Sequence, residues 1–340
     1  MLNTSKKLYL HAPNLHVGGG LTLLQALYSA PKLDIVFEHV DLRALKKLPQ
    51  AQGERYVVRP TFFSRVAAEV RIWRRIGNND VLLCLHGLVP LLPSRGEVIV
   101  FLQNRLLLNG DNLQGYPLST RARLLIERLM LKTLSFRVKK FIVQTPSMAE
   151  QAKLFLGPQS VIVICPFVSE KLVFPTINPN KRYDYIYIAS GERHKNHAKL
   201  LDAWCLLAQQ GLRPSLVLTV PYESPIAIMV EQCKQQWGLN IFNVGQISKD
   251  EVLALYNQSG ALVYPSTTES LGLPLIEASQ RQMPIIAAEL DYVRDVVDPV
   301  ETFDPNSSVS IARAVKRHLG VSVTREPISG PGEFLEEVLR

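Results

Sequence analysis

The amino-acid sequence predicts an α/β protein built from two Rossmann-like domains that face each other across a cleft. With 340 residues and 47% apolar content, the chain exceeds what one hydrophobic core usually supports, so two domains of about 150 residues are expected. Short apolar runs alternate with segments of helical length, which is typical of parallel sheets covered by helices. Such sheets bind ligands at the carboxyl ends of their strands, so two in tandem enclose a substrate cleft.

The apolar runs predict a strand order along the chain that is repeated in the two halves. The first-half strands are LYLHA from Leu8, DIVF from Asp34, RYVV from Arg55, DVLLCLH from Asp80, EVIVFLQ from Glu97, KFIVQT from Lys140 and VIVIC from Val161. The second-half strands are YDYIYIAS, SLVLTV, NIFNVG, GALVYP, MPIIAA and ETFD. No short internal repeat is evident, so the halves resemble each other in architecture only.

The joint between the domains is predicted at residues 166–182, where three prolines and two asparagines interrupt the pattern. This linker separates a first domain at 1–165 from a second domain at 183–320. The tail at 321–340 contains EFLEEVLR and is expected to form a final helix that packs back on the first domain.

Positive charge is concentrated before this joint. Residues 1–165 carry 22 Lys and Arg against 10 Asp and Glu, whereas residues 166–340 carry 16 against 20. The net charges of +12 and −4 indicate that the first domain meets a polyanion or a membrane surface.

That charge is predicted to centre on one basic amphipathic helix, Ser119 to Lys140, which has five leucines among seven Lys and Arg residues. One interpretation is a core-packed helix with a solvated basic face, and the other is a contact with anionic lipid headgroups. No nucleic acid partner is expected, because no recognisable DNA- or RNA-binding motif accompanies the charge. The apolar residues of the segment are Leu124, Leu125, Leu129, Leu131 and Leu134, and the basic residues are Arg121, Arg123, Arg128, Lys132, Arg137, Lys139 and Lys140.

The cysteines Cys84, Cys165, Cys205 and Cys233 form neither a disulfide framework nor a metal pattern, and they are expected to be reduced, buried thiols. No run of the sequence has the length of a signal peptide core or a membrane span. We therefore predict a cytoplasmic protein, at most peripheral on the inner face of the cell membrane.

The stretch YPSTTESLGLPLIEA, residues 264–278, has the pattern of a ligand-binding strand, turn and helix. The run ALVY predicts a buried strand, TTES offers capping side chains, and a helix is expected to start near Leu273 or Pro274. Free amides at that helix start favour an anion such as a diphosphate. Glu277 can accept hydrogen bonds from ribose hydroxyls and Glu269 can reach a sugar, although each carboxylate alone is compatible with a capping or solvated role.

Glu269 and Glu277, eight positions apart around Ser270, Gly272 and Pro274, resemble the E-x7-E signature of the retaining GT4 glycosyltransferases. The resemblance covers roughly Asp184 to Val297 and implies the GT-B fold. It also implies a nucleoside-diphosphate sugar as co-substrate, no metal or other cofactor, and donor contacts from Ser270, Leu271, Gly272, Leu273 and Glu277.

A second loop, Ser190 to His197, follows a predicted strand and offers Gly191 for close backbone approach, with Arg193 and Lys195 as cations for a departing diphosphate. GT4 enzymes bind the donor phosphates with an Arg and a Lys from such a loop, although the spacing differs here, and this favours Lys195. His194 and His197 are expected to be exposed or to cap a helix, and no metal site is predicted. Gly245, after a later strand, resembles the segment that borders the nucleobase.

In the first half, Gly18, Gly19 and Gly20 predict a flexible turn before a helix, next to the donor diphosphate or the acceptor. A dinucleotide fingerprint would need glycine in place of Leu23, so NAD binding with Glu38 on the ribose is the minor alternative.

Gln103, Asn104 and Arg105 stand where many GT4 relatives present a histidine near the reacting sugar. The amides can hydrogen-bond a sugar, and Arg105 can meet an acceptor phosphate. His86 is the alternative cleft histidine, although a hydrogen-bonded residue at a strand end would look the same.

The sequence thus predicts a retaining glycosyltransferase that moves a sugar from a UDP or GDP sugar to a hydroxyl in α-linkage, with Glu269 and Lys195 as its catalytic residues. The charge and the resemblance together suggest a lipid-linked or other saccharide acceptor in bacterial surface polysaccharide synthesis. An inactive GT-B scaffold subunit and a sugar-nucleotide epimerase are the alternatives.

Overall fold

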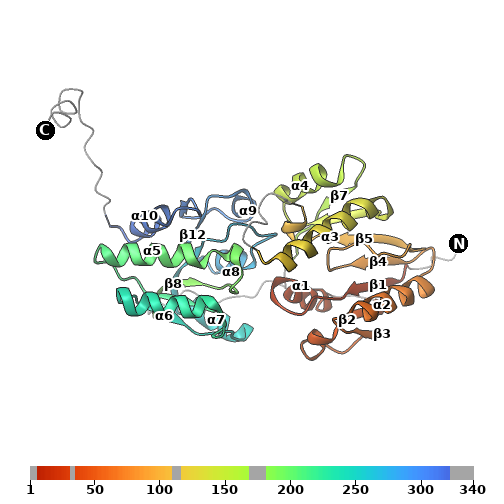
Figure 1. The fold of residues 1–340 in the computed structure, drawn as a ribbon, viewed down its shortest axis with the longest axis horizontal. Helices are drawn as coiled ribbons and strands as arrows, with labels where there is room; N and C mark the ends of the chain where they lie inside the picture. Colours follow the sequence, from red (N-terminus) through yellow and green to blue (C-terminus); the bar gives the residue numbers. More distant parts are fainter. Residues whose placement is uncertain (1–5, 31–34, 109–115, 168–180, 322–340) are drawn as a thin grey trace, which may run out of the picture.

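The computed structural model describes residues 6–30, 35–108, 116–167 and 181–321 of the chain. Figure 1 shows two halves side by side, each a sheet covered by helices. All thirteen predicted strands are present, and every pairing between them is parallel.

The N-terminal half is a seven-stranded sheet in the order β3-β2-β1-β4-β5-β6-β7. The chain leaves β1 on one side for β2 and returns on the other for β4, so the strand order reverses between β1 and β4. Its elements are β1 (Leu8–Ala12), α1 (Gly18–Tyr28), β2 (Ile35–Asp41), η1 (Leu42–Lys47), β3 (Glu54–Val58), α2 (Phe62–Arg75), β4 (Val81–Cys84), β5 (Glu97–Phe101), η2 (Arg105–Leu107), α3 (Leu118–Leu134), η3 (Ser135–Arg137), β6 (Lys140–Val143), α4 (Pro146–Leu156) and β7 (Ile162–Ile164).

The C-terminal half is a six-stranded sheet in the order β10-β9-β8-β11-β12-β13, with the reversal between β8 and β11. A ligand crevice is expected at such a reversal, outside the carboxyl ends of the two strands. Its elements are β8 (Tyr183–Tyr187), η4 (Arg193–Lys195), α5 (His197–Gln209), β9 (Leu216–Leu218), α6 (Pro225–Trp237), β10 (Ile241–Asn243), α7 (Lys249–Asn257), β11 (Ser259–Tyr264), α8 (Leu273–Gln280), β12 (Ile285–Ala288), α9 (Asp291–Arg294), β13 (Glu301–Phe303) and α10 (Ser308–His318).

The two halves differ in how their cores are built. One continuous cluster fills the C-terminal half, and helices α5 and α10 cover its sheet with side chains such as Trp204 and Ile311. The N-terminal core is divided into two clusters, one on each side of the sheet. Leu273, the first residue of α8, packs against the second of these clusters, so the C-terminal half contributes to the core of the N-terminal half.

Polar contacts also join the halves near the carboxyl ends of their strands. The Ser147 amide donates to Asp295 Oδ2 at 3.0 Å, and Gln144 Nε2 donates to Ser270 Oγ at 3.3 Å. Both residues of the N-terminal half lie at or just before the start of α4, where the chain leaves β6. The carboxyl edges of the two sheets therefore face each other.

Two predictions fall largely outside the described residues, namely most of the linker at 166–182 and all but Val321 of the tail at 321–340. The four cysteines are free, but only Cys84 is buried, and the prediction is wrong for Cys165, which is exposed. Across the described ranges, no helix is both long and apolar enough to cross a bilayer.

Candidate functional site

The loop between β11 and α8 leaves the start of that helix open. Gly272 is its N-cap residue, with a φ of +72° that side chains other than glycine rarely adopt, and no side chain caps the helix. The capping role expected of Thr267, Thr268 and Ser270 is therefore wrong. Among the described residues, no side chain caps the first amides of α8 at the carboxyl edge of the sheet, as an anion site requires.

The glycine turn of the first half differs from the prediction in the same region. Gly18, Gly19 and Gly20 form the first turn of α1 rather than a loop before it, and no side chain caps this helix either. A Cβ atom built on Gly19 would lie 3.7 Å from Leu273 Cδ1, so the starts of α1 and α8 meet. Two helix N-termini without side-chain caps, one from each half, thus converge at the interface.

The predicted catalytic residues lie on the two loops that flank the reversal between β8 and β11. Lys195 Nζ is 2.7 Å from Glu269 Oε1, and both side chains are largely buried, with 17% and 12% of their surface exposed. Because neither group is freely solvated, this ion pair fixes the two loops relative to each other more strongly than a surface salt bridge would. The structure brings together the cation assigned to the diphosphate and the carboxylate assigned to the sugar.

Three buried tyrosines, which the sequence analysis did not single out, hold these loops. Tyr187 Oη donates to Lys195 O at 2.6 Å, Tyr264 Oη donates to Glu269 Oε1 at 3.1 Å, and Tyr292 Oη donates to Ser266 O at 2.7 Å. Burial raises the pKa of each phenol well above its ordinary value, so each remains a neutral donor. Their only sequence signal is a hydroxyl at the tip of an otherwise apolar side chain on or beside a buried strand.

A cavity of about 820 Å³ opens beside this pair and is lined from both halves. The C-terminal half contributes Gly191, Arg193 and His194, and the N-terminal half contributes Arg105 and Tyr116. Tyr116 Oη approaches His194 Nδ1 at 3.4 Å across the cavity. The predicted donor cation Arg193 therefore faces a space of ligand size that both halves enclose.

His197 also lines this cavity, and its predicted exposure is wrong, because only 2% of the residue is exposed. Within the part of the chain that the structure describes, neither ring nitrogen has a hydrogen-bond partner, and the ring centroid lies 4.9 Å from that of Tyr187, with the two rings tilted. Burial lowers the pKa of His197 to about 3, so the ring is neutral at physiological pH. A neutral imidazole offers one donor and one acceptor to a ligand.

Arg105 bridges the halves instead of extending freely into the cleft. Its guanidinium donates to Gln151 Oε1 at 3.0 Å, to Ser147 Oγ at 3.2 Å and to the backbone oxygen of Glu269 at 3.4 Å. Burial lowers the pKa of Arg105, and Asp291 and Asp295 oppose this effect. The residue therefore links the N-terminal half directly to the loop that carries Glu269.

The other first-half candidates are engaged within their own half. Gln103 Nε2 donates to Leu85 O at 2.7 Å, and its Oε1 would be 3.0 Å from a Cβ on Gly20, so the two residues are in contact. Asn104 Oδ1 caps η2 by accepting from the Leu106 amide. His86 approaches the oxygen of His11 with Nδ1 at 3.2 Å, so Nδ1 carries the proton and Nε2 is left as the acceptor.

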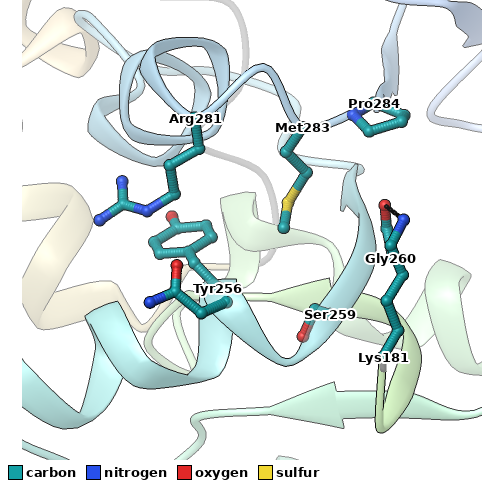
Figure 2. A pocket seen from close by; sticks show the side chains of 8 residues that line it. Lys181, Tyr256, Ser259, Gly260, Arg281, Met283 and Pro284 are labelled. Carbon is teal, nitrogen blue, oxygen red and sulfur yellow. Dashed lines mark hydrogen bonds between the residues drawn. The ribbon is translucent and has the colours of Figure 1, made fainter. Parts of the chain in front are cut away.

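Glu277 lies within α8, and its Oε2 accepts a hydrogen bond from Tyr256 Oη at 3.0 Å. Burial raises the pKa of Glu277, whereas Tyr256 and Arg281 lower it. Figure 2 shows Tyr256 and Arg281 beside a small pocket, and the Arg281 guanidinium carbon lies 4.7 Å from the Tyr256 ring centroid. The pocket lies at the amino ends of β8, β11 and β12 and has about 20 Å³, room for roughly one water, so Tyr256 supports Glu277 from the edge opposite the cleft.

Gly245 lies under an exposed aromatic ring that the sequence analysis missed. Gly245 has a φ of +72°, and a Cβ there would come within 2.5 Å of the Tyr222 ring, which is 63% exposed. Only a glycine accommodates both features. Tyr222 follows β9 and Gly245 follows β10, so both lie at the carboxyl edge of the sheet.

Comparison with known proteins identifies the second half of the chain. The family of glycosyl transferases group 1 matches residues 168–326. The chain carries a group 1, GT4-type glycosyltransferase domain. The matched segment contains both loops of the Lys195–Glu269 pair, and the recognition made from the sequence is confirmed.

Two relatives from Escherichia coli align with parts of the chain. The serotype-specific mannosyltransferase WbdA is 28% identical over 140 residues, which is 40% of this chain and 17% of that protein. The O-antigen chain mannosyltransferase B is 27% identical over 153 residues, or 43% and 39% of the two chains. The chain thus aligns with less than half of either curated glycosyltransferase.

The fold comparison covers nearly the whole chain. The Anabaena protein HepE, solved in complex with UDP and glucose, superposes with a TM-score of 0.70 over 93% of this chain and 90% of its own, at 13% identity. The fold is GT-B, as predicted. The group 1 domain is therefore the second of two facing sheets, and the first half is matched in fold alone.

The minor alternative of NAD binding does not fit this geometry. Glu38, which would have to bind a ribose, is 1% exposed and forms an ion pair with Arg55 through Oε1. Its Oε2 accepts the hydroxyl of Tyr28. Both oxygens are occupied inside the sheet, so neither is available to a dinucleotide.

Proposed function

We propose that the protein is a retaining glycosyltransferase that moves a sugar from a nucleoside-diphosphate sugar, with UDP or GDP as carrier, to a hydroxyl acceptor in α-linkage. The observation that carries this proposal is the Lys195–Glu269 pair beside the open start of α8, within the segment that matches the group 1 family. A diphosphate and a sugar are the two ligand groups that this combination suits.

The diphosphate is assigned to the amides of Leu271, Gly272 and Leu273 together with Lys195 and Arg193. Charge accumulates on the leaving diphosphate during transfer, so fixed amides and cations that stabilise it lower the barrier. Gly191 allows the backbone to approach the ligand closely. This set of residues supplies the positive charge without a metal ion, and we assign no cofactor to the reaction.

The remainder of the donor is assigned by the same geometry. Glu269 accepts hydrogen bonds from the sugar hydroxyls, Ser270 lies next to it, and Glu277 accepts from the ribose. Tyr222 over Gly245 offers a flat apolar surface to the base. Glu269 forms an ion pair with Lys195, so a diphosphate bound at Lys195 would replace one anion beside this cation with another.

The acceptor is assigned to the N-terminal half, beside Gly18 to Gly20, His86, Gln103 and Asn104. The two Escherichia coli relatives are a serotype-specific mannosyltransferase and an O-antigen chain mannosyltransferase, which supports an acceptor in bacterial surface polysaccharide synthesis. The charge of +12 on residues 1–165 supports a lipid-linked saccharide at the inner face of the cell membrane.

Thermal unfolding with a panel of ligands tests the donor site. UDP, GDP and their sugars are compared with CMP and NAD, because a ligand of the native state raises the melting temperature by mass action. We expect one of UDP or GDP to stabilise the wild-type protein and to lose this effect in Glu277→Ala. Glu251→Ala, which removes an exposed capping-box carboxylate of α7, is the control that should keep the ligand shift. Stabilisation by NAD alone, or by no nucleotide, would refute the proposal.

A further inference from the structure

Helix α3 exposes a row of large apolar side chains. Leu118, Leu125, Ile126, Leu129 and Phe136, here called the α3 face, are 78%, 57%, 59%, 63% and 78% exposed. The spacing of 7, 4 and 7 residues from 118 to 125, 129 and 136 places them along one side of the helix and its continuation in η3. Contiguous exposed apolar surface of this kind indicates an interaction site.

The opposite side of α3 fixes its orientation. Leu124 and Leu131 are 1% and 0% exposed and belong to the core of the N-terminal half. Arg128 stacks on Phe155 of α4 at 5.0 Å, so one of the predicted surface cations faces inward. The core packing of α3 expected in one interpretation is present, but its exposed side carries large apolar side chains as well as cations.

Cations border this apolar row. Arg123 is an exposed neighbour of Leu125 and Ile126. Lys132, one turn beyond Leu129, is also exposed, and its Nζ lies 6.0 Å from the Phe155 ring centroid at the edge of the helix. Glu127 is the one acidic residue between Ser119 and Lys140, and its contact with Arg123 is long, at 3.9 Å. The surface thus combines a central apolar stripe with a positive border.

We propose that the α3 face docks on an anionic lipid bilayer. Apolar side chains that enter the boundary between headgroups and acyl chains, flanked by cations that meet the headgroups, are how an amphipathic helix binds a membrane in plane. A second copy of this chain fits less well. Pairing two such faces would bring two sets of cations together, and like charges across an interface are unfavourable.

The position of α3 relates the proposed membrane contact to the cleft between the halves. Figure 1 shows α3 running along the N-terminal half with its first turn directed toward the C-terminal half. Tyr116, two residues before α3, lines the cavity and contacts His194 across it. Docking through α3 therefore places the cleft beside the headgroups, where a lipid-linked acceptor is presented. The docking proposal is argued from the exposure and charge of α3 residues alone, so it does not depend on the proposed function.

Sedimentation with sucrose-loaded vesicles tests the docking. The vesicles contain phosphatidylcholine with or without phosphatidylglycerol, and salt is varied. The apolar variant is Leu125→Gln/Ile126→Gln/Leu129→Gln, and the charge variant is Arg123→Gln/Lys132→Gln. The matched control is Ile228→Gln/Val300→Gln/Val309→Gln, which changes three residues of the other half that are 60%, 59% and 46% exposed.

We expect binding that requires phosphatidylglycerol and weakens with salt. The charge variant should bind about 30-fold more weakly at low salt, from about 1 kcal/mol per cation. The apolar variant should bind more than about tenfold more weakly, while the control binds as the wild type. All three should keep the melting temperature and its nucleotide shift, which separates loss of docking from loss of donor binding.

Several results would overturn the proposal. The first is that the wild-type protein does not bind vesicles. The second is that it binds neutral and anionic vesicles equally well. The third is that the apolar variant binds anionic vesicles as strongly as the wild type. If light scattering shows a dimer of the wild type that the apolar variant abolishes, without vesicle binding, the α3 face is an interface between copies.

Discussion

The two halves of the molecule share an architecture but differ in how their sites are prepared. In the C-terminal half, the loops after β8 and β11 are held by three tyrosine hydroxyls and join in one buried ion pair. In the N-terminal half, the polar side chains at the strand ends form hydrogen bonds with backbone groups of the same half. These side chains are Gln103, Asn104 and His86. Polar side chains of the C-terminal half are thus fixed against one another across two loops, whereas those of the N-terminal half are fixed against their own backbone.

The comparisons show the same difference between the halves. The family match covers residues 168–326, whereas the first half is matched in fold only. We infer that the chemistry of a nucleoside diphosphate fixes the residues it needs in the C-terminal half. The acceptor surface of the N-terminal half is free to vary, because a hydroxyl on a larger saccharide can be presented by many different contacts. The predictions below test this division of roles.

The largest expected effect follows from breaking the ion pair. Lys195→Ala and Glu269→Gln should each lower the rate of sugar transfer about 10²- to 10³-fold, because each removes a group that acts where charge develops. Lys195→Ala should also weaken diphosphate binding, whereas Glu269→Gln should leave it near the wild-type value. Isothermal titration with the nucleoside diphosphate, run beside the transfer assay, distinguishes these roles. Equal loss of diphosphate binding in both variants would contradict them.

A smaller effect is expected at the contact between the halves. Arg105→Met keeps most of the side-chain volume but removes the hydrogen bonds to Ser147, Gln151 and the Glu269 backbone. The expected destabilisation is about 1.5–3 kcal/mol, measured by urea unfolding, since bonds to a charged group are lost in a buried place. Transfer should fall through misplacement of Glu269. Arg294→Met, which breaks an exposed pair with Glu289, should cost much less.

The last prediction concerns the change of stability with pH, to which buried histidines of both halves contribute, His197 of the C-terminal half among them. Burial lowers the pKa of His39 to about 3 and that of His86 to about 4, and both rings pack beside His11 in the N-terminal half. Because the unfolded chain protonates these rings near pH 6.5, it binds more protons than the native state between that pH and the native pKa values. Stability should therefore fall on acidification through this window, by up to about 1.4 kcal/mol per pH unit per histidine.

Urea unfolding between pH 7 and pH 4.5 measures this slope. His39→Gln should make it shallower, although it lowers stability at pH 7 by disrupting the ring cluster. A slope that His39→Gln does not alter would show that other groups account for the acid sensitivity.

The fold was readable from the sequence because parallel strands buried on both faces appear as short apolar runs, and all thirteen were found. Glu269 and Lys195 were singled out because they are charged residues in loops that follow buried strands, and the structure brings these two side chains together. Tyr187, Tyr264 and Tyr292 were missed because their rings look like core residues, and only the three-dimensional structure shows where each hydroxyl is directed.

The errors have physical reasons as well. His197 was expected at the surface, but its stacking on Tyr187 depends on a contact between α5 and β8 that no local pattern encodes. Gly18 to Gly20 were assigned to a loop because glycine has a low helix propensity, whereas the close approach of Gln103 to Gly20 leaves no space there for a side chain. For α3, the period of the leucines was visible, but which half of them faces the core depends on α4 and the sheet.

The most direct test of the central claim is transfer itself. Wild-type protein is incubated with UDP- or GDP-linked radioactive sugars and lipid extract from bacterial membranes, and the labelled lipid product is digested with α- and β-specific glycosidases. The account predicts label in the lipid fraction that α-glycosidase releases and that Glu269→Gln fails to form. A protein that binds the nucleotide but transfers no sugar, or that yields a β-linked product, would contradict it.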